Sequence, residues 1–347
     1  MNRIIIFLLF FLSLPTTFAA NFQIHVRGQN GKAIINEQKK TIFIPVNYYG
    51  KSGVYPLDKA PVDIFKVEEN ISHTLPSTLD LRNWSSFKIG EEEWKIKGGY
   101  QLPGSDFQTW HTEKVKGFAT FGHVTCDAMV GSEKQRIWDN GNPAYSTSGS
   151  KSWPTYRTQL ADGSYAAELT TRSILGIIAS GNLFTGRIVR DMSLKQLLGF
   201  TDKDGKALIR WGVPFTGRPT GFQVKFKYEG KGDSCTLMST LENHQNGKRR
   251  YVAAAWYSGK TDYEKNKEGV ISISEPDKNG LRTLKVKFIY GKQHANADPF
   301  PDGVVQGNAD EPITHINVVF ASSRKGDYFK GVKGAKLIVK DFKLLYE

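Results

Sequence analysis

A polar loop around one tryptophan holds the residue types best suited to bind a sugar. In the stretch from Trp138 to Pro143, Asp139, Asn140 and Asn142 are interleaved with a glycine. Glycine and proline break regular structure, so the stretch is predicted to be an irregular loop. The apolar face of a pyranose stacks on an aromatic ring, and its hydroxyls bond to carboxylates and carboxamides. The loop therefore has the chemistry of a glycan-binding site.

The same loop also has a purely structural interpretation. Asp and Asn in turns readily hydrogen-bond to the neighbouring backbone, and a large aromatic such as Trp138 commonly fills a core. Trp110 and Trp153 are alternative stacking platforms, and Trp110 too has the character of a core residue. The loop residues alone favour the structural interpretation, so the context must decide.

The elements that position this loop are predicted to be β-strands. The 347 residues suit two domains, and their 12% aromatics and 34 glycines favour strands joined by turns. Short alternating strands predict an immunoglobulin-like β-sandwich over residues 20–99. Longer strands, such as 222–228 with its alternating apolar residues, predict an antiparallel jelly-roll sandwich over residues 100–347. One short helix is expected at 193–198. The fold class is therefore all-β.

The N-terminus predicts export. Arg3 is followed by an apolar run and a small-residue cleavage sequence ending at Ala19, which is typical of a secretory signal peptide over residues 1–19. The run is too short to span a bilayer, and no cysteine near the cleavage point offers a lipid anchor. We expect a periplasmic or extracellular protein without a lipid anchor.

The net charge of the chain is +13, and such a balance favours anionic partners such as an acidic polysaccharide. The lysines are scattered at alternating positions and form no block of the nucleic-acid-binding kind. A solvated sheet face explains most of this charge. We therefore expect a glycan or polysaccharide, either acidic or neutral, and no nucleic acid.

Two cysteines leave one structural question open. Cys126 and Cys235 either form a disulfide, which an exported compartment permits, or are two separately buried thiols.

Eight segments between residues 101 and 329 occur in an order that carries a family resemblance. They are Gln101–Trp110, Trp138–Pro143, Trp153–Thr155, Ala166–Thr171, Gly181–Gly186, Pro214–Phe222, Gly232–Cys235 and Val319–Phe329. On these segments the chain resembles the putative carbohydrate metabolism domain (PCMD) proteins of Bacteroidetes over roughly residues 101–346, and the resemblance implies a jelly roll with a carbohydrate-related role. The chain departs from the family in lacking a lipobox cysteine and in carrying Gly104 and Gln108 in the opening motif.

The last predicted strand suggests a metal site. Its apolar residues change phase at Asp341, which requires either a β-bulge or a buried carboxylate with a partner. Many carbohydrate-binding jelly rolls hold a structural Ca²⁺ where an early polar turn meets an Asp of the last strand. Asp106 and Asp341 have the hard oxygen ligands for such an ion.

Three functions fit these observations. The first is glycan recognition by the Trp138 loop, Asn182 and Arg218, although an ion pair between Arg218 and Glu168 is an equal alternative. The second is a glycoside hydrolase, which needs two carboxylates about 5–9.5 Å apart. The third is a structural or adhesive protein. No zinc-ligand, phosphate-loop, dinucleotide or serine-hydrolase motif is present. The candidate carboxylates are Asp127, Asp139, Glu168 and Glu242.

Overall fold

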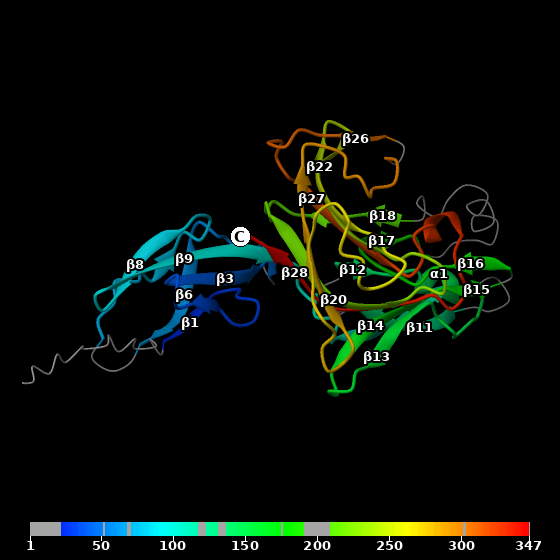
Figure 1. Ribbon diagram of the computed structural model, residues 1–347, viewed down its shortest axis with the longest axis horizontal. Coiled ribbons are helices and arrows are strands. Elements are labelled where there is room, and N and C mark those ends of the chain that lie inside the picture. Colours follow the sequence, from blue (N-terminus) through cyan, green and yellow to red (C-terminus); the bar gives the residue numbers. More distant parts are fainter. Residues whose placement is uncertain are drawn as a thin grey trace, which may run out of the picture. The chain divides into compact units, whose positions relative to one another are not determined.

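The computed structural model divides the chain into two compact units (Figure 1). It describes residues 22–50, 53–67, 71–116, 123–130, 137–174, 176–190, 209–300 and 303–346. The expected signal peptide and the helix expected at 193–198 lie outside these residues. One unit comprises Met1–Pro45 with Pro56–Gly98, and the other comprises Val46–Tyr55 with Gly99–Glu347. Among the described residues, no helix is long and apolar enough to cross a membrane.

The smaller unit is built from two antiparallel sheets. In β3(Thr41–Asn47) every second residue is buried, which places Ile42 and Ile44 in the interior. Trp94 and Ile96 of β9(Glu92–Gln101) are buried there as well. The unit is thus a small β-structure as predicted, and its immunoglobulin-like character stays a prediction. The sheets are β1(Gln23–Val26)-β6(Ala60–Lys66)-β7(Thr78–Leu79) and β2(Ile34–Asn36)-β3(Thr41–Asn47)-β9(Glu92–Gln101)-β8(Ser85–Ile89).

The larger unit contains two large sheets. The nine-stranded sheet follows the order β12(Trp138–Asp139)-β17(Asn182–Ile188)-β27(His315–Ala321)-β21(Thr236–Gln245)-β22(Lys248–Tyr257)-β25(Ile289–Tyr290), joined by β18(Ile209–Trp211), β19(Val213–Pro214) and β26(Val304–Gln306). The six-stranded sheet follows the order β13(Thr155–Gln159)-β14(Tyr165–Thr170)-β28(Lys336–Leu345)-β20(Gly221–Glu229)-β24(Arg282–Lys287)-β23(Val270–Ile273).

The order of these strands is that of a jelly roll. Eight strands are divided between the sheets so that β14-β28-β20-β24 lie in one and β17-β27-β21-β22 in the other, and every consecutive pair except β21 and β22 crosses from one sheet to the other. In one sheet the last of the eight strands, β28, lies beside the first, β14. In the other sheet the seventh, β27, lies beside the second, β17. Two Greek keys give this arrangement. The predicted antiparallel jelly roll is confirmed.

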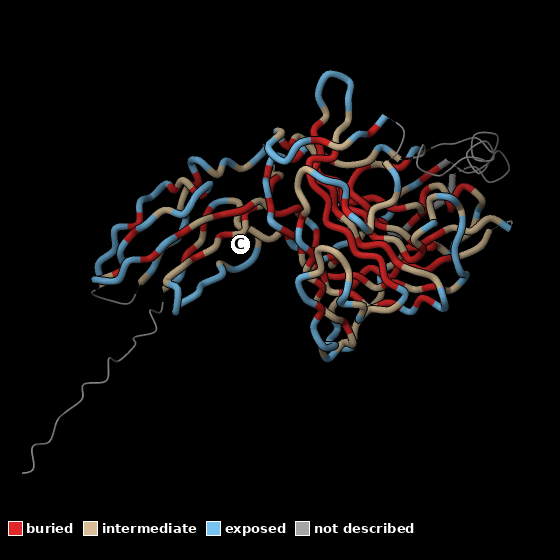
Figure 2. Tube along the Cα trace, turned by 45° about the horizontal axis from the view of Figure 1, so that its top comes forward, coloured by how far each residue is buried: buried red, intermediate tan, exposed pale blue. Residues whose placement is uncertain are grey.

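The sandwich core follows from strand alternation. Phe222, Val224 and Phe226 of β20 are fully buried in one apolar cluster with Leu237 and Phe320 of the other sheet. Figure 2 shows long buried stretches, in red, running along the strands of the larger unit. Since successive side chains of a strand point to opposite faces, the intervening residues of the nine-stranded sheet face away from this core. We call that side of the sheet the outer face.

A second, smaller apolar cluster lies on the outer face. Phe184, Ile188 and Val319 are buried together, and Trp211 and Met238 pack against them. Their immediate neighbours Leu183 and Phe320 belong to the sandwich core instead. The nine-stranded sheet therefore buries residues on both of its faces.

The remaining elements are short. Two hairpins pair β10(Trp110–Lys116) with β11(His123–Val130) and β15(Arg172–Ile174) with β16(Ile177–Ala179). A third pairs β4(Tyr49–Gly50) with β5(Gly53–Val54), and η2(Gly326–Tyr328) is a 3₁₀ turn. The helix α1(Asn142–Ser146) begins inside the loop predicted to be irregular. That prediction was wrong at this point, because Pro143 is tolerated in the first turn of a helix.

The phase change in β28 is a β-bulge. Gln223 pairs with Lys343 and Lys225 with Lys340, so two residues of β28 stand opposite one residue of β20. Asp341 has a φ of 54°, in the left-handed region that Asp enters more readily than most residues. The bulge predicted as one of two explanations is confirmed.

The two cysteines are separately buried. Cys126 Sγ donates to Met129 Sδ at 3.7 Å, and Cys235 Sγ donates to the Gly259 carbonyl at 3.4 Å. Burial raises the pKa of the Cys235 thiol to about 12. The structure therefore favours the interpretation of two buried thiols over a disulfide.

Candidate functional site

Trp138 is a core residue. It is 3% exposed, and its ring packs against Phe107, Phe320 and Phe342 at centroid distances of 5.1, 6.1 and 5.9 Å. Its indole N–H donates to the Pro103 carbonyl at 3.2 Å. Because its ring faces are covered by other aromatics, Trp138 has no free face on which a sugar ring could stack. The platform interpretation of Trp138 was wrong, and the structural one holds.

The polar residues of the same loop hold the loop together. Asn140 Oδ1 accepts from the Asn142 amide at 2.9 Å. The Asn142 side chain donates to the Thr155 carbonyl at 2.6 Å and accepts from the Thr155 amide at 3.1 Å. Asn182 Oδ1 accepts from the Gly141 amide at 2.7 Å, so Asn182 does join the loop as predicted. In each of these bonds a side chain pairs with a backbone group, so the described contacts give the loop a structural role.

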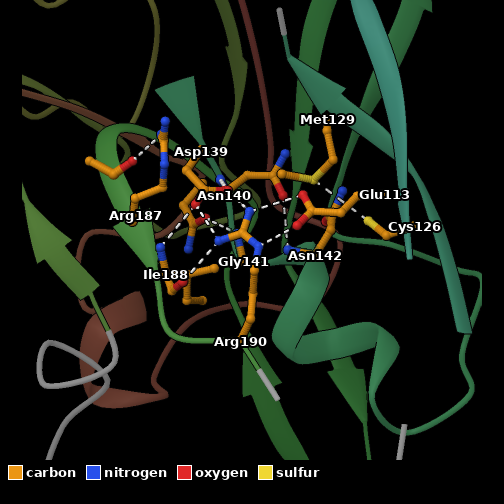
Figure 3. Close-up of polar contacts among 12 residues, drawn as sticks. Glu113, Cys126, Met129, Asp139, Asn140, Gly141, Asn142, Arg187, Ile188 and Arg190 are labelled. Carbon is orange, nitrogen blue, oxygen red and sulfur yellow. Dashed lines mark hydrogen bonds and ion pairs between the residues drawn. The ribbon is translucent and has the colours of Figure 1, made fainter. Parts of the chain in front are cut away.

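Asp139 belongs to a buried ionic cluster centred on Arg190 (Figure 3). Arg190 Nη1 lies 2.9 Å from Asp139 Oδ2, and Arg190 Nε lies 2.5 Å from Glu113 Oε1. The side chains of Arg190, Glu113 and Asp139 are 20%, 10% and 1% exposed. Asp139 also accepts from the amides of Asn140 and Ile188, both at 2.9 Å. The cluster ties β10, β12 and the end of β17 to one another.

The charge of Arg190 is secured by its partners. Burial by itself would lower the pKa of the Arg190 guanidinium, but the hydrogen bonds that it donates to Glu113 and Asp139 raise this pKa above its usual range. The arginine therefore stays positive and compensates both carboxylates.

A pocket lined by arginines lies beside this cluster. Its volume is about 380 Å³, and its lining residues are Arg187, Ile188, Val189, Arg190 and Arg210. We call it the arginine pocket. Arg187 of β17 and Arg210 of β18 stand directly opposite each other in the strand register. Together with Arg190, these two arginines give the pocket a positively charged lining, which favours an anionic group.

The two arginines differ in their present contacts. Arg187 Nη1 donates to the Gly186 carbonyl at 2.7 Å. Arg210 is exposed, and within the described part of the chain its guanidinium has no hydrogen-bond or ion-pair partner. A guanidinium matches the geometry of a carboxylate or sulfate with two parallel N–H donors. The pocket is thus suited to an anionic group.

Arg218 lies elsewhere and does not join the loop. It donates to the carbonyls of Glu311, at 2.9 Å, and Ala309, and its guanidinium lies over the Tyr290 ring. Glu168 instead pairs with Lys336 at 3.0 Å. Both predictions for Arg218, as a partner of the Trp138 loop and as the ion partner of Glu168, were wrong.

The predicted carboxylates do not converge on a hydrolytic pair. Asp139 lies on β12 and Glu242 on β21, three strands apart in one sheet, which is about 14 Å at the usual strand spacing. Glu168 belongs to the other sheet, on the side of β14 opposite to the core residues Ala167 and Leu169. The side chain of Asp127 lies outside the described residues.

One carboxylate pair that the sequence did not predict does lie close together. Glu113 Oε2 and Asp139 Oδ1 lie 3.0 and 3.2 Å from the same atom, Arg190 Nη2, and so no more than 6.2 Å from each other. Glycosidase carboxylates have such separations. Here, however, the guanidinium occupies the space in which the glycosidic oxygen and water would have to sit.

The two proposed calcium ligands come from backbone segments that lie side by side, but few other oxygen ligands accompany them. The Phe342 amide donates to the Ser105 carbonyl at 2.9 Å, which brings the residues next to Asp106 and Asp341 together. Lys225 Nζ lies 3.8 Å from Asp341 Oδ2, where it competes with a cation. Among the described residues, no three His, Cys, Asp or Glu side chains gather as a metal site. These residues fit calcium poorly, and the ion stays a prediction.

Sequence reasoning missed the residues that make the pocket. Arg190 follows a strand in an unremarkable segment, and Glu113 is 77 residues away from it. The pairing of β17 with β18 places Arg187 beside Arg210. Only the excess of basic residues in the sequence hinted at such a site.

Comparisons with known proteins agree with the resemblance. A family model described as "Putative carbohydrate metabolism domain" (PCMD) matches residues 106–345. No curated protein matches the chain. A putative glycoside hydrolase from Bacteroides thetaiotaomicron VPI-5482 has 17% identity and a TM-score of 0.44, covering 94% of this chain and 96% of that one. A putative glycoside hydrolase from Bacteroides vulgatus ATCC 8482 has 17% identity and a TM-score of 0.46, covering 70% and 97%.

Proposed function

The chain belongs to the putative carbohydrate metabolism domain family, and we propose that it is an exported protein that binds an acidic glycan in the arginine pocket. The observation that carries this proposal is the placement of Arg187 opposite Arg210 across β17 and β18, beside Arg190. A uronate carboxylate or a sulfate group supplies the negative charge that this arrangement favours.

The neighbouring loop supports the pocket from behind. Asp139 holds both Arg190 and the Ile188 amide, and Ile188 and Arg190 are themselves lining residues. The Trp138 loop thus contributes to recognition by fixing the pocket wall, and the arginines supply the polar contacts. In this proposal the glycan is recognised by the charged arginines of the pocket and not by stacking on Trp138.

A carboxylate-pair hydrolase has less support. Asp139 and Glu242 lie three strands apart in one sheet, about 14 Å, which exceeds the roughly 5–9.5 Å that the mechanism needs, and Glu168 belongs to the other sheet. Arg190 separates Glu113 from Asp139. The structural or adhesive alternative predicts that the pocket binds no glycan at all, so binding decides between it and our proposal.

The test compares one polymer with and without its charge. We expect the full chain to bind polygalacturonate in affinity electrophoresis or calorimetry, and to bind its methyl ester much more weakly. Arg210→Gln and Arg187→Gln should each weaken binding about tenfold or more, since a charged hydrogen bond contributes about 1.5–3 kcal/mol. Arg82→Gln is the matched control, because Arg82 is an exposed arginine paired with Asp80 in the smaller unit.

Two results would contradict the proposal. Equal binding of the esterified polymer would show that the carboxylates are not recognised. If polygalacturonate, alginate, hyaluronan and a sulfated glycan all fail to bind, the structural or adhesive alternative takes its place.

A further inference from the structure

A second ionic cluster lies on the outer face of the nine-stranded sheet, around Glu242 of β21. Glu242 is fully buried and accepts four hydrogen bonds. The donors are Thr240 Oγ1 at 2.6 Å, His244 Nε2 at 2.7 Å, and Arg249 Nε and Nη2 at 2.5 and 3.0 Å. Burial raises the pKa of the Glu242 carboxyl, but the bonds from His244 and Arg249 outweigh it, so the pKa is lowered. Glu242 is therefore an ionised anchor with no lone pair left for a substrate.

The anchor fixes the orientation of two neighbours. His244 donates Nε2–H to Glu242, which directs its Nδ1 edge away from the carboxylate. Arg249 donates hydrogen bonds to Glu242 from Nε and Nη2, so its Nη1 can donate to a ligand. Within the part of the chain that the structure describes, neither His244 Nδ1 nor Arg249 Nη1 has another hydrogen-bond partner. Both side chains are partly exposed, at 26% and 23%.

A second imidazole stacks on the first. The rings of His244 and His315 are parallel within 17°, with centroids 3.9 Å apart. Thr314 Oγ1 lies 2.9 Å from His315 Nδ1 and 3.3 Å from the Glu242 carbonyl, and its single hydrogen serves one of these two acceptors. When that hydrogen goes to the carbonyl, His315 Nδ1–H donates to Thr314 Oγ1 and His315 Nε2 keeps a lone pair. Burial and then the charge of His244 lower the pKa of His315, which is therefore neutral at pH 7.

Two buried polar atoms on the outer face have no hydrogen-bond partner among the described residues, and a ligand could supply one. These atoms are Asn317 Oδ1 and Trp256 Nε1. Asn317 lies two residues from His315 on β27, so both point to the outer face, while Ile316 and Val318 point to the core. A sugar hydroxyl donates to a carboxamide oxygen and accepts from an indole N–H.

We infer that this outer-face cluster cleaves a uronate-containing glycan by β-elimination, an inference that rests on the acidic glycan proposed above. The arrangement supplies a base, an acid and a cation. His315 Nε2 accepts the proton from C5, Arg249 Nη1 neutralises the adjacent carboxylate, and protonated His244 donates from Nδ1 to the departing oxygen.

The step balances without a further reactant. The electrons of the C5–H bond form the C4=C5 double bond, the C4–O bond breaks, and its electron pair leaves on the oxygen that receives the proton from His244. One proton enters His315 and one leaves His244, so the charge of the pair is unchanged. Stacked imidazoles suit this exchange, because two positive charges on rings whose centroids are 3.9 Å apart repel each other, so a proton taken up by His315 favours the loss of one from His244. Glu242 acts through His244 and Arg249 as a positioning residue.

The test follows the new double bond. The full chain is incubated with polygalacturonate, alginate and hyaluronan, and the ultraviolet absorbance of the unsaturated product is recorded together with binding. We expect product from the wild type. The rate of product formation should fall by at least about 100-fold in His315→Gln and in His244→Gln, because general acid–base catalysis commonly contributes a factor of this size. His25→Gln, in the smaller unit, is the matched control. Thermal melts establish that each variant is folded, and Glu242→Gln should shift the pH profile as well as the rate.

Three outcomes overturn the inference and separate it from the proposed function. If the protein binds a polymer but forms no unsaturated product, the lyase inference is wrong and the acidic-glycan proposal is retained. Saturated reducing ends with incorporation of labelled water indicate hydrolysis instead. If none of the three polymers binds to the protein, the inference falls, and the acidic-glycan proposal falls with it when a sulfated glycan also fails to bind.

Discussion

Replacing Arg190 by Met tests the ionic cluster behind the arginine pocket. The change leaves Glu113 and Asp139 without their shared cation, although they are 10% and 1% exposed and at most 6.2 Å apart. Breaking a buried ion pair by removing one partner typically costs about 3–5 kcal/mol. For a unit of this size, each kcal/mol lowers Tm by about 2–4 °C. We therefore expect the free energy of unfolding to fall by about 4 kcal/mol and Tm by roughly 8–16 °C.

The assay is urea unfolding at pH 7 followed by tryptophan fluorescence, with calorimetry for Tm. Arg82→Met is the control, because Arg82 pairs with Asp80 at the surface and its loss should have no measurable effect. A triple variant with Glu113→Gln and Asp139→Asn should recover part of the loss, since no charge then remains buried. A loss below about 1 kcal/mol for Arg190→Met, the range of a surface pair, would refute the reasoning.

Three further predictions follow from other residues. Because the pKa of Glu242 is lowered from its usual 4.5, its contribution to stability is fully present above that value and is lost as pH falls through the lower, folded pKa; Glu242→Gln should flatten stability measured by urea unfolding between pH 6 and 3. Trp138→Ala should cost about 3–5 kcal/mol of unfolding free energy, while the variant that remains folded keeps its glycan affinity, and a selective loss of binding would restore the platform interpretation. A calcium ion at Asp106 and Asp341 predicts a higher Tm in Ca²⁺ than in EDTA, abolished in Asp341→Asn; an equal Tm in both leaves only the bulge.

The strand pattern of the larger unit could be predicted because it is local. In residues 222–228 every second side chain is apolar, and this alternation alone places Phe222 and Phe226 in a core. The bulge at Asp341 could be inferred in the same way, since a change of apolar phase within one strand has few explanations.

The candidate site could be predicted only in part. Asp139, Asn142 and Asn182 were correctly placed together, but their side chains turned out to hold backbone and Arg190. An Asp or Asn in a turn bonds equally well to a ligand or to the chain, and the sequence does not show which atoms are near. The exposure of Trp138 was misjudged for the same reason, since the aromatic rings that cover it come from distant segments.

The sequence by itself determined the all-β class, the jelly-roll character of the larger unit and the basic net charge, and it limited the phase change in the last strand to a bulge or a buried carboxylate. These depend on neighbouring residues or on composition. Only the tertiary structure decided which charges meet: Arg187 with Arg210 across β17 and β18, Arg190 with Glu113, and His244 with His315. Such pairs join residues 23 to 77 positions apart, and their energy depends on distance and burial, which the order of residues along the chain does not specify.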